Sequence, residues 1–412
     1  MSKVFFTDTR ARPDRNLLNK IEGLLERMKL VTTVKKAELV AIKLHFGELG
    51  NCAFLRPVFL RPIVEKLKAL GAQPFLTDTN TLYKGSRSNA VNHLDTAMHN
   101  GFDYASVGCP IIIADGLRGA NGLKVKVPGG VLKEVSIARE IAEADSMIVV
   151  THFKLHELSG FGGALKNIGM GGASREGKLV QHSTLAPQVN IEKCKGCKIC
   201  FDYCPSGAIS LKEKKAAINS GGLARRNLSS EHGEPGTRVR VREAHTASPG
   251  EGATGYPRAG VPMIEGRTCI GCGECIAICP EGAIEIQWTD DADLFQKKMV
   301  EHAYGALQGK KKTIFLNFVI DVSPACDCYP CNDAPIVRDV GMLASFDPVS
   351  IDAASADLVN NEESLPGTVI KQTLKRGLDK FRGVYPSVDW NVQLDHAEKL
   401  GMGERKYMLV KV

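Results

Sequence analysis

Eight of the thirteen cysteines follow one spacing twice. Segments 194–205 (CKGCKICFDYCP) and 269–280 (CIGCGECIAICP) both read C-x2-C-x2-C-x3-C-P. Aligned at an offset of 75 residues, 9 of the 16 positions in 194–209 are identical, which indicates an internal duplication. The chain shows no export signal, so we expect the cysteines in a reducing compartment, where they are metal ligands or redox groups rather than disulfides. The repeat predicts two metal centres.

The spacing favours iron–sulfur clusters over zinc. Zinc sites usually pair two C-x2-C knuckles across a gap, whereas four cysteines within eleven residues match iron–sulfur ligation. Residues 188–288 resemble a two-cluster bacterial-type ferredoxin domain. The resemblance implies that one [4Fe–4S] cluster is bound by Cys194, Cys197, Cys200 and Cys279, and the other by Cys269, Cys272, Cys275 and Cys204. Cubanes with four thiolates carry single low-potential electrons and leave no position open for substrate.

The flanking sequence alternates strand-like and helix-like stretches. Apolar runs at 3–8, 37–46, 72–80, 110–116, 145–153 and 311–320 predict strands, and helical periodicity appears at 16–30, 56–71, 88–102, 135–144, 291–308 and 347–360. This alternation predicts an α/β fold: a largely parallel sheet flanked by helices, interrupted by an inserted α+β ferredoxin-like domain. We expect residues 1–187 and 289–412 to fold together around the insert at 188–288.

Residues 220–260 differ in composition from the rest of the insert. Their 41 positions include 8 Gly and no Lys. A segment this poor in large apolar side chains buries little surface, so we expect a flexible excursion whose role the sequence does not supply.

Polar side chains follow several of the predicted strands. Ligands of open α/β sheets gather at the carboxyl ends of the strands. We therefore take as candidates for orienting or protonating a ligand Lys43, His45, His152, Lys154 and His156. Asp78 and Asn80, which end another strand, are candidates for holding a cofactor.

A glycine-rich stretch, GFGGALKNIGMGG, follows the strand that ends at His152. Its backbone N–H groups could hold an anion with help from a lysine, so Gly162, Gly163, Lys166 and Asn167 are further cofactor-binding candidates. The stretch matches neither the dinucleotide-binding glycine pattern nor a P-loop. The alternative is a tight turn against the sheet with Lys166 in solvent.

Cys326, Cys328 and Cys331 form a third cysteine group, C-x-C-x2-C, after the strand at 311–320. Three interpretations remain open: a third metal site, a redox-active thiol pair, or thiolates that meet substrate. The alternative is a set of free thiols in a reducing cell.

The segments outside 212–263 resemble the DUF362 family, which has no defined function. The resemblance lies in KLHFGE (43–48), DTNTLY (78–83), the stretch 151–171 and the stretch 326–352. It implies an iron–sulfur protein, mostly of anaerobic microbes, in which the ferredoxin pair is inserted. It implies no substrate.

Composition excludes some classes of partner. The net charge of +7 is spread along the chain, so nucleic acid is not implied, and no apolar run is long enough to span a bilayer. We expect a cytoplasmic protein that binds a redox partner protein and an unknown small molecule. Its oligomeric state is unknown.

Two hypotheses for the function follow. The first is an iron–sulfur oxidoreductase whose clusters serve a substrate, metal or organic cofactor in the α/β cleft. The second is a non-catalytic module that carries electrons or delivers a metal or cluster. Redox sensing through cluster loss is a weaker third.

Overall fold

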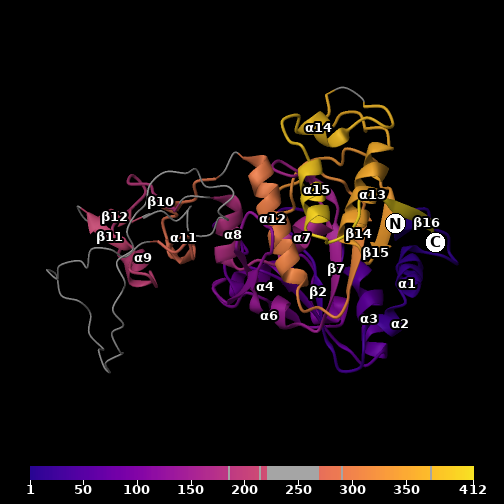
Figure 1. The fold of residues 1–412 in the computed structure, drawn as a ribbon, viewed down its shortest axis with the longest axis horizontal. Coiled ribbons are helices and arrows are strands. Elements are labelled where there is room, and N and C mark those ends of the chain that lie inside the picture. Colours follow the sequence, from indigo (N-terminus) through magenta and orange to yellow (C-terminus); the bar gives the residue numbers. More distant parts are fainter. Residues whose placement is uncertain (184–185, 213–214, 220–268, 289–290, 372–373) are drawn as a thin grey trace.

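A mixed, mostly parallel sheet forms the body of the protein (Figure 1). The computed structural model describes residues 1–183, 186–212, 215–219, 269–288, 291–371 and 374–412, so the expected excursion at 220–260 lies outside the described residues. The strand order is β16-β1-β15-β14-β7-β2-β3-β4. The strands are β1 (Ser2–Asp8), β2 (Leu39–Lys43), β3 (Gln73–Asp78), β4 (Ile111–Ile113), β7 (Ser146–His152), β14 (Thr313–Val319), β15 (Gly341–Ser345) and β16 (Tyr407–Lys411).

The central strands run in parallel. β7 pairs in parallel with β2 and with β14, and β3 pairs in parallel with β2 and β4. Every residue of β7 is buried, as expected for a strand covered on both faces. The predicted α/β class is therefore confirmed. The β14–β7 pair also joins the segments before and after the cysteine region in one sheet.

Helices cover both faces of the sheet. Within β7, Met147 and Val149 belong to one hydrophobic core and Ile148 and Val150 to the other, as the alternation of side chains along a strand requires. The first core is closed by α6 (Arg139–Glu143), α7 (Ala164–Gly169), α12 (Ala292–Leu307), α13 (Pro348–Asn360), α14 (Lys380–Val384) and α15 (Asn391–Lys399). The second is closed by α1 (Leu17–Arg27), α2 (Leu30–Thr33), η1 (Pro57–Leu60), α3 (Arg61–Ala69), α4 (Ala90–His99) and α5 (Tyr104–Val107).

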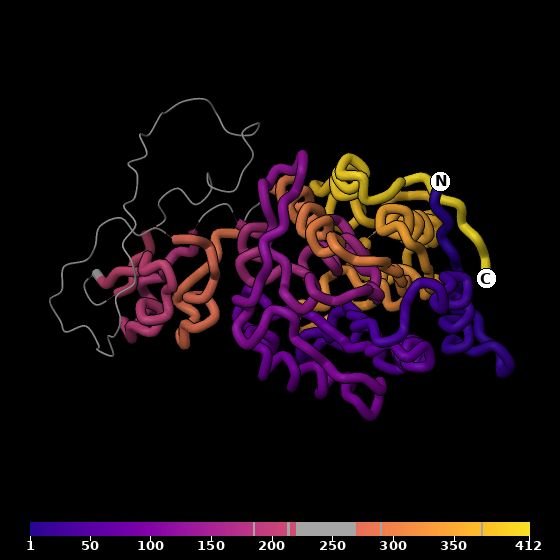
Figure 2. Tube along the Cα trace, turned by 60° about the horizontal axis from the view of Figure 1, so that its bottom comes forward, coloured from indigo at the N-terminus to yellow at the C-terminus, as the bar shows by residue number. Residues whose placement is uncertain are grey.

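The cysteine region forms a small unit that projects from the body beside α8 (Arg175–His182), as Figure 2 also shows. We call the described residues 188–219 and 269–286 the cysteine module. It contains β10 (Gln188–Val189) paired with β13 (Ile284–Glu285), β11 (Ile209–Lys212) paired with β12 (Lys215–Ile218), and the short helices α9 (Ile199–Asp202) and α11 (Glu274–Ile278).

The two halves of the cysteine module repeat the same backbone. Gly196 and Gly271 both have positive φ (68° and 76°), and so do Lys198 and Gly273 (68° and 73°). Lys198 directly precedes the short helix α9, and Gly273 directly precedes the short helix α11. The duplication in sequence is thus a duplication in structure.

Several elements were not predicted. The sequence analysis did not place β15 and β16, nor the hairpin of β8 (Lys154–His156) and β9 (Gly160–Gly162); a further hairpin pairs β5 (Gly122–Lys126) with β6 (Glu134–Ala138). Among the helices that the structure describes, none is long and apolar enough to cross a membrane.

Candidate functional site

The first cysteine set surrounds one small cavity. Cys194, Cys197, Cys200 and Cys279 all line it, although Cys279 comes from the second motif. Burial raises the pKa of Cys200 to about 11, and the charges of the other three cysteines add to that rise, which places them close by. The fourth cysteine of this set therefore comes from the other motif, as the resemblance to bacterial-type ferredoxins implies.

The second set gathers in the same crossed manner. Burial raises the pKa of Cys269, Cys272 and Cys275, and in each case the nearby Cys204 adds to the rise. Cys204 belongs to the first motif, so it has crossed to the second set.

Backbone N–H groups point at these sulfurs in equivalent places. Ala208 N lies 3.2 Å from Cys204 Sγ, and Ala283 N lies 3.2 Å from Cys279 Sγ. Hydrogen bonds of this kind stabilise cluster thiolates and tune their potential. Among the described residues no three His, Cys, Asp or Glu side chains converge on a single ion. A cubane takes four thiolates, one for each iron, and each of the two sets supplies four cysteines.

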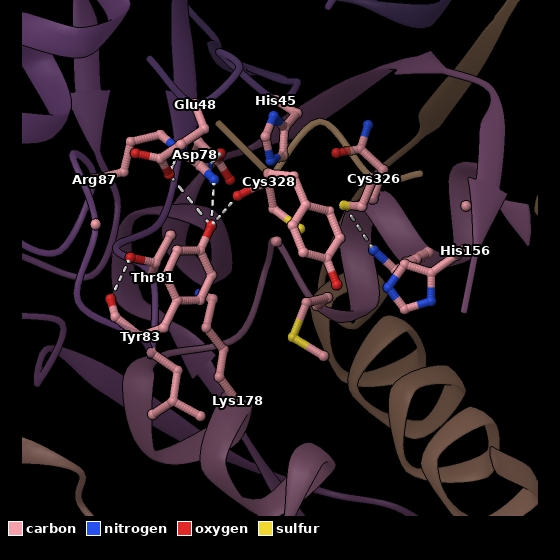
Figure 3. A pocket seen from close by; sticks show the side chains of 18 of the residues that line it. His45, Glu48, Asp78, Thr81, Tyr83, Arg87, His156, Lys178, Cys326 and Cys328 are labelled. Atoms are coloured by element: carbon pink, nitrogen blue, oxygen red, sulfur yellow. Dashed lines mark hydrogen bonds and ion pairs between the residues drawn. The ribbon is translucent and has the colours of Figure 1, made fainter. Parts of the chain in front are cut away.

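A second, larger cavity of about 830 Å³ opens at the carboxyl ends of β2, β3 and β7. Figure 3 shows side chains from several segments entering it, including His45, Tyr83, Arg87 and Cys328. Of the predicted site residues, ten line the cavity: Lys43, His45, Asp78, His152, Lys154, His156, Gly162, Gly163, Lys166 and Asn167. Cys326 and Cys328 line it too. These residues lie far apart in the sequence. The fold brings them together because the carboxyl ends of parallel strands meet at one edge of the sheet.

A buried charge network forms one wall of the large cavity. Lys43 Nζ lies 3.0 Å from Asp78 Oδ1, and Arg87 lies 3.6 Å from Asp78 and 3.1 Å from Glu48. Burial raises the pKa of Asp78, but the charges of Lys43 and its other neighbours outweigh it, and the pKa lies below the usual range. Burial lowers the pKa of Lys43. Because each of these buried charges has a partner of opposite sign, the network is stabilised within the protein and does not depend on solvent.

Asp327 anchors a second network. Its carboxylate, fully buried, lies 3.0 Å from His152 Nδ1 and 2.7 Å from Lys154 Nζ. His152 Nε2 faces the carbonyl oxygens of Ile320 and Asp321 at 2.9 and 3.1 Å. Both ring nitrogens therefore have hydrogen-bonding partners within the protein. His152 and Lys154 are thus held by Asp327 rather than directed at a ligand.

Cys326 is an activated thiol. Lys166 Nζ lies 3.6 Å from its sulfur, and Cys328 lies two residues further on in the same cavity wall. The neighbouring Cys328 thiol, together with the charge of Lys166, holds the pKa of Cys326 well below the usual range despite burial, while the proximity of Cys326 raises the pKa of Cys328. The pair is one thiolate and one thiol. Cys331 is exposed and does not line the cavity.

The first two N–H groups of α7, within the glycine-rich stretch, are already occupied. Ala164 N and Leu165 N donate to Asp352 at 2.7 and 2.9 Å, and a Cβ at Gly163 would lie 2.3 Å from Asp352 Oδ1. The anion that this loop holds is thus a carboxylate of the chain itself. Gly162 and Gly163 belong to the wall of the cavity, not to an anion cradle.

Other candidates have structural surroundings. Asn80 is buried, hydrogen-bonds Asp115 at 2.8 Å, and does not line the cavity. His45 Nδ1 accepts from Gly47 N at 3.0 Å, and His156 Nδ1 accepts from Leu158 N at 3.2 Å. Burial holds the pKa of both histidines well below the usual range, so they are neutral.

Sequence analysis missed Glu48, Tyr83, Arg87, Lys178 and Asp327. Glu48 and Tyr83 lie inside the two segments that carry the family resemblance, and Asp327 lies between two cysteines, so their positions offered a signal. Arg87 and Lys178 stand in no motif, and only the fold brings them to the cavity.

One loop joins the large cavity to the cysteine module. Leu82 lines the cavity and also packs in the module's core with Cys275 and Cys200. Lys84, its neighbour in the cavity wall, donates to Pro280 O at 2.6 Å. A Cβ at Gly273 would lie 3.4 Å from Leu82 Cδ1, so this side of the module approaches the cavity closely.

The chain belongs to the family described as "Domain of unknown function (DUF362)", whose model matches residues 40–357. No curated protein matches it. Two solved structures show partial similarity at a TM-score of 0.31: the lactate racemase apoprotein from Thermoanaerobacterium thermosaccharolyticum (17% identity, 45% of this chain, 42% of that one) and a structural-genomics protein from Thermotoga maritima (12% identity, 42% and 41%). The chain thus covers less than half the length of either.

Proposed function

We propose that this protein is an iron–sulfur redox protein that passes single electrons to a small molecule or cofactor in the large cavity. The two cysteine quartets would each hold a [4Fe–4S] cluster, which supplies one-electron transfer at low potential. The observation that carries the proposal is the loop at Leu82, whose side chain contacts both the cavity and the core that contains Cys275.

The exposure of the cysteines supports a direction of electron transfer through the cysteine module. Cys197 is exposed, and Lys195 and Lys198 beside it are exposed too, whereas Cys275 is buried on the side of Leu82. The first quartet would therefore receive electrons from a redox partner protein with an acidic surface, and the second would face the cavity. A reducing, cytoplasmic setting and an inserted electron-transfer domain at 188–288 are part of this proposal.

The cavity residues would position a ligand and exclude water. Asp78 and Asp327 fix the buried cations around them, and neutral His45 can accept or donate one proton. The Cys326 thiolate is the strongest nucleophile in the wall.

The test is the metal content of oxygen-free protein. We expect about eight iron and eight sulfide per chain, with an electron paramagnetic resonance signal of reduced clusters. Cys275→Ser should lose roughly half the iron, and the matched control Cys331→Ser should keep all of it. Zinc in place of iron, or equal loss in both variants, would contradict the proposal.

A non-catalytic carrier is the second candidate, and the exposed Cys197 edge favours it, since docking a partner needs only that surface. His45→Gln separates the two, because this side chain lines the cavity and belongs to neither cysteine quartet. A carrier should still reduce a partner protein at the wild-type rate, and a cavity enzyme should lose turnover while it retains both clusters.

A further inference from the structure

Cys326 and Cys328 face each other across a single residue. The Tyr329 N–H donates to Cys326 O at 3.1 Å and closes a turn over residues 326–329. A turn brings residues two apart within the range of about 4.4–6.8 Å between Cα atoms that a disulfide requires. Both cysteines line the same cavity, and each shifts the pKa of the other. The turn and the shared cavity wall thus place the pair for an S–S bond.

The groups around the pair separate the roles of the two sulfurs. Lys166 Nζ, 3.6 Å from Cys326, donates a hydrogen bond to that sulfur, whereas it acts on Cys328 through its charge only. Asp327, between the cysteines, is held by His152 and Lys154, so the turn cannot swing away from the cavity. Attack by a thiolate and resolution by a neighbouring thiol is the arrangement that thiol–disulfide exchange needs.

We propose that Cys326 and Cys328 are a redox-active dithiol that reduces a small-molecule disulfide bound in the large cavity. Cys326 is only 3% exposed, so a protein disulfide could not reach it, whereas a cavity of about 830 Å³ admits a small molecule. The supply of electrons to the dithiol rests on the proposed function above.

The exchange balances without a further reagent. The Cys326 thiolate attacks one sulfur of the substrate, forms a mixed disulfide and releases the first substrate thiolate. Cys328, after giving its proton to that thiolate, attacks Cys326 Sγ and releases the second substrate thiolate. The Cys326–Cys328 disulfide remains, and the substrate has taken up two electrons and one proton, leaving as one thiol and one thiolate.

Return to the dithiol consumes two electrons and one proton. The S–S bond breaks, the proton ends on Cys328 Sγ, and the negative charge stays on Cys326 beside Lys166. An iron–sulfur donor delivers the electrons one at a time. The route from the cysteine module is short: Leu82 packs in its core, and the adjacent Tyr83 hydroxyl donates to Cys328 O at 2.9 Å.

The first arm of the test needs no cluster. Anaerobic holoprotein is treated with hydroxyethyl disulfide, free thiols are alkylated, and peptides are identified by mass spectrometry. The wild type should form the Cys326–Cys328 disulfide. Cys328→Ser should trap a mixed disulfide on Cys326, at least about tenfold faster than on Cys331, because only Cys326 is an activated thiolate. The Cys331→Ser control should behave as wild type.

The second arm asks where the electrons come from. The oxidised holoprotein is mixed with a reduced two-cluster ferredoxin, a protein donor too large to enter the cavity. Wild type should recover both thiols, and Cys275→Ser should not. No Cys326–Cys328 disulfide, or no mixed disulfide in Cys328→Ser, overturns the inference whatever the clusters do. A disulfide that forms but resists ferredoxin in wild type upholds the dithiol and contradicts the proposed electron route.

Discussion

At the scale of single residues, the tripeptide Cys326–Asp327–Cys328 carries most of the chemistry. Its two thiols line the cavity, while the carboxylate between them is fully buried against His152 and Lys154. The buried side chain of Asp327 thus fixes the direction in which Cys326 and Cys328 point. The sequence indicated the thiols but not the anchor, because the partners of Asp327 lie on β7 and β8, 175 and 173 residues earlier.

Removing the charge of Asp327 tests that anchor. Asp327→Asn leaves the buried Lys154 ammonium without its counterion and removes the partner of His152, and we expect the free energy of unfolding to fall by about 3–5 kcal/mol. Chemical denaturation of oxygen-free protein measures the loss. Asp333→Asn changes an exposed carboxylate nearby and should alter stability by less than about 0.5 kcal/mol. Equal effects would contradict the anchoring role.

Lys166 should set the protonation state of Cys326. Because the neighbouring Cys328 thiol and the charge of Lys166 lower the pKa of Cys326, alkylation of this thiol should stay fast as pH falls from 9 to 7. Lys166→Met removes one of these causes, so the rate at pH 7 should drop about tenfold or more, while the rate above pH 9 changes little. The pH profile of iodoacetamide labelling at Cys326 gives the answer. Identical profiles would exclude this role for Lys166.

At the scale of elements, a carboxylate from one helix caps another. Asp352 of α13 accepts from the first N–H groups of α7 and from Asn317 Nδ2 at 2.8 Å on β14. The glycine-rich stretch looked like an anion site in sequence, and it is one, but the anion is 188 residues away in the same chain. Local sequence predicts the donors and cannot predict an internal acceptor.

The same contact predicts a pH dependence of stability. Burial raises the pKa of Asp352 to about 6, above its value in the unfolded chain, so the folded protein binds the proton more tightly. The stability from this group is complete below about pH 4 and is lost as pH rises through 6, by roughly 3 kcal/mol. Asp352→Asn should remove this slope. Denaturation midpoints measured between pH 4 and 7 test this prediction. If stability changes with pH equally in the wild type and in Asp352→Asn, the assignment of the pH dependence to Asp352 is wrong.

The elements themselves were predictable to different degrees. Buried parallel strands such as β7 and β14 are continuous apolar runs, which the sequence displays directly. β16 escaped prediction because this edge strand is partly exposed and its pattern is weak. β15 lies fully buried between β1 and β14, and its antiparallel pairing depends on strands far away in the chain. The residues of the cavity divide in the same way. The sequence indicated those at the ends of strands, but it did not indicate Arg87, which lies on a loop.

At the scale of the whole molecule, both halves of the cysteine module contact the body: the Arg118 guanidinium lies 4.8 Å from the ring centroid of Tyr203 in the first half, and Gly273 of the second half lies against Arg175. A Cβ at Gly273 would lie 3.0 Å from Arg175 Cγ of α8, whereas the equivalent position in the other half holds Lys198 at the same positive φ. A side chain at position 273 would therefore have to push Arg175 aside, whereas the equivalent Lys198 is exposed and carries its side chain in a strained, left-handed conformation.

This asymmetry predicts opposite results for matched substitutions. Gly273→Ala introduces both a clash and a left-handed alanine, so it should destabilise the contact with the body and expose the module to protease. Lys198→Gly relieves strain and should stabilise the module by roughly 1 kcal/mol. Limited proteolysis and thermal unfolding of the iron-loaded proteins compare the two. If Gly273→Ala is as stable as wild type, the module does not dock through this half.

Trp288 gives the large cavity a built-in optical probe. The chain has two tryptophans; Trp288 lines the cavity beside His182, while Trp390 packs against Phe161 and Phe381 in the core. In a Trp390→Phe background, the emission of the remaining indole would respond to occupancy of the cavity alone. A library of small disulfides could then be ranked by fluorescence titration, without any assay of turnover.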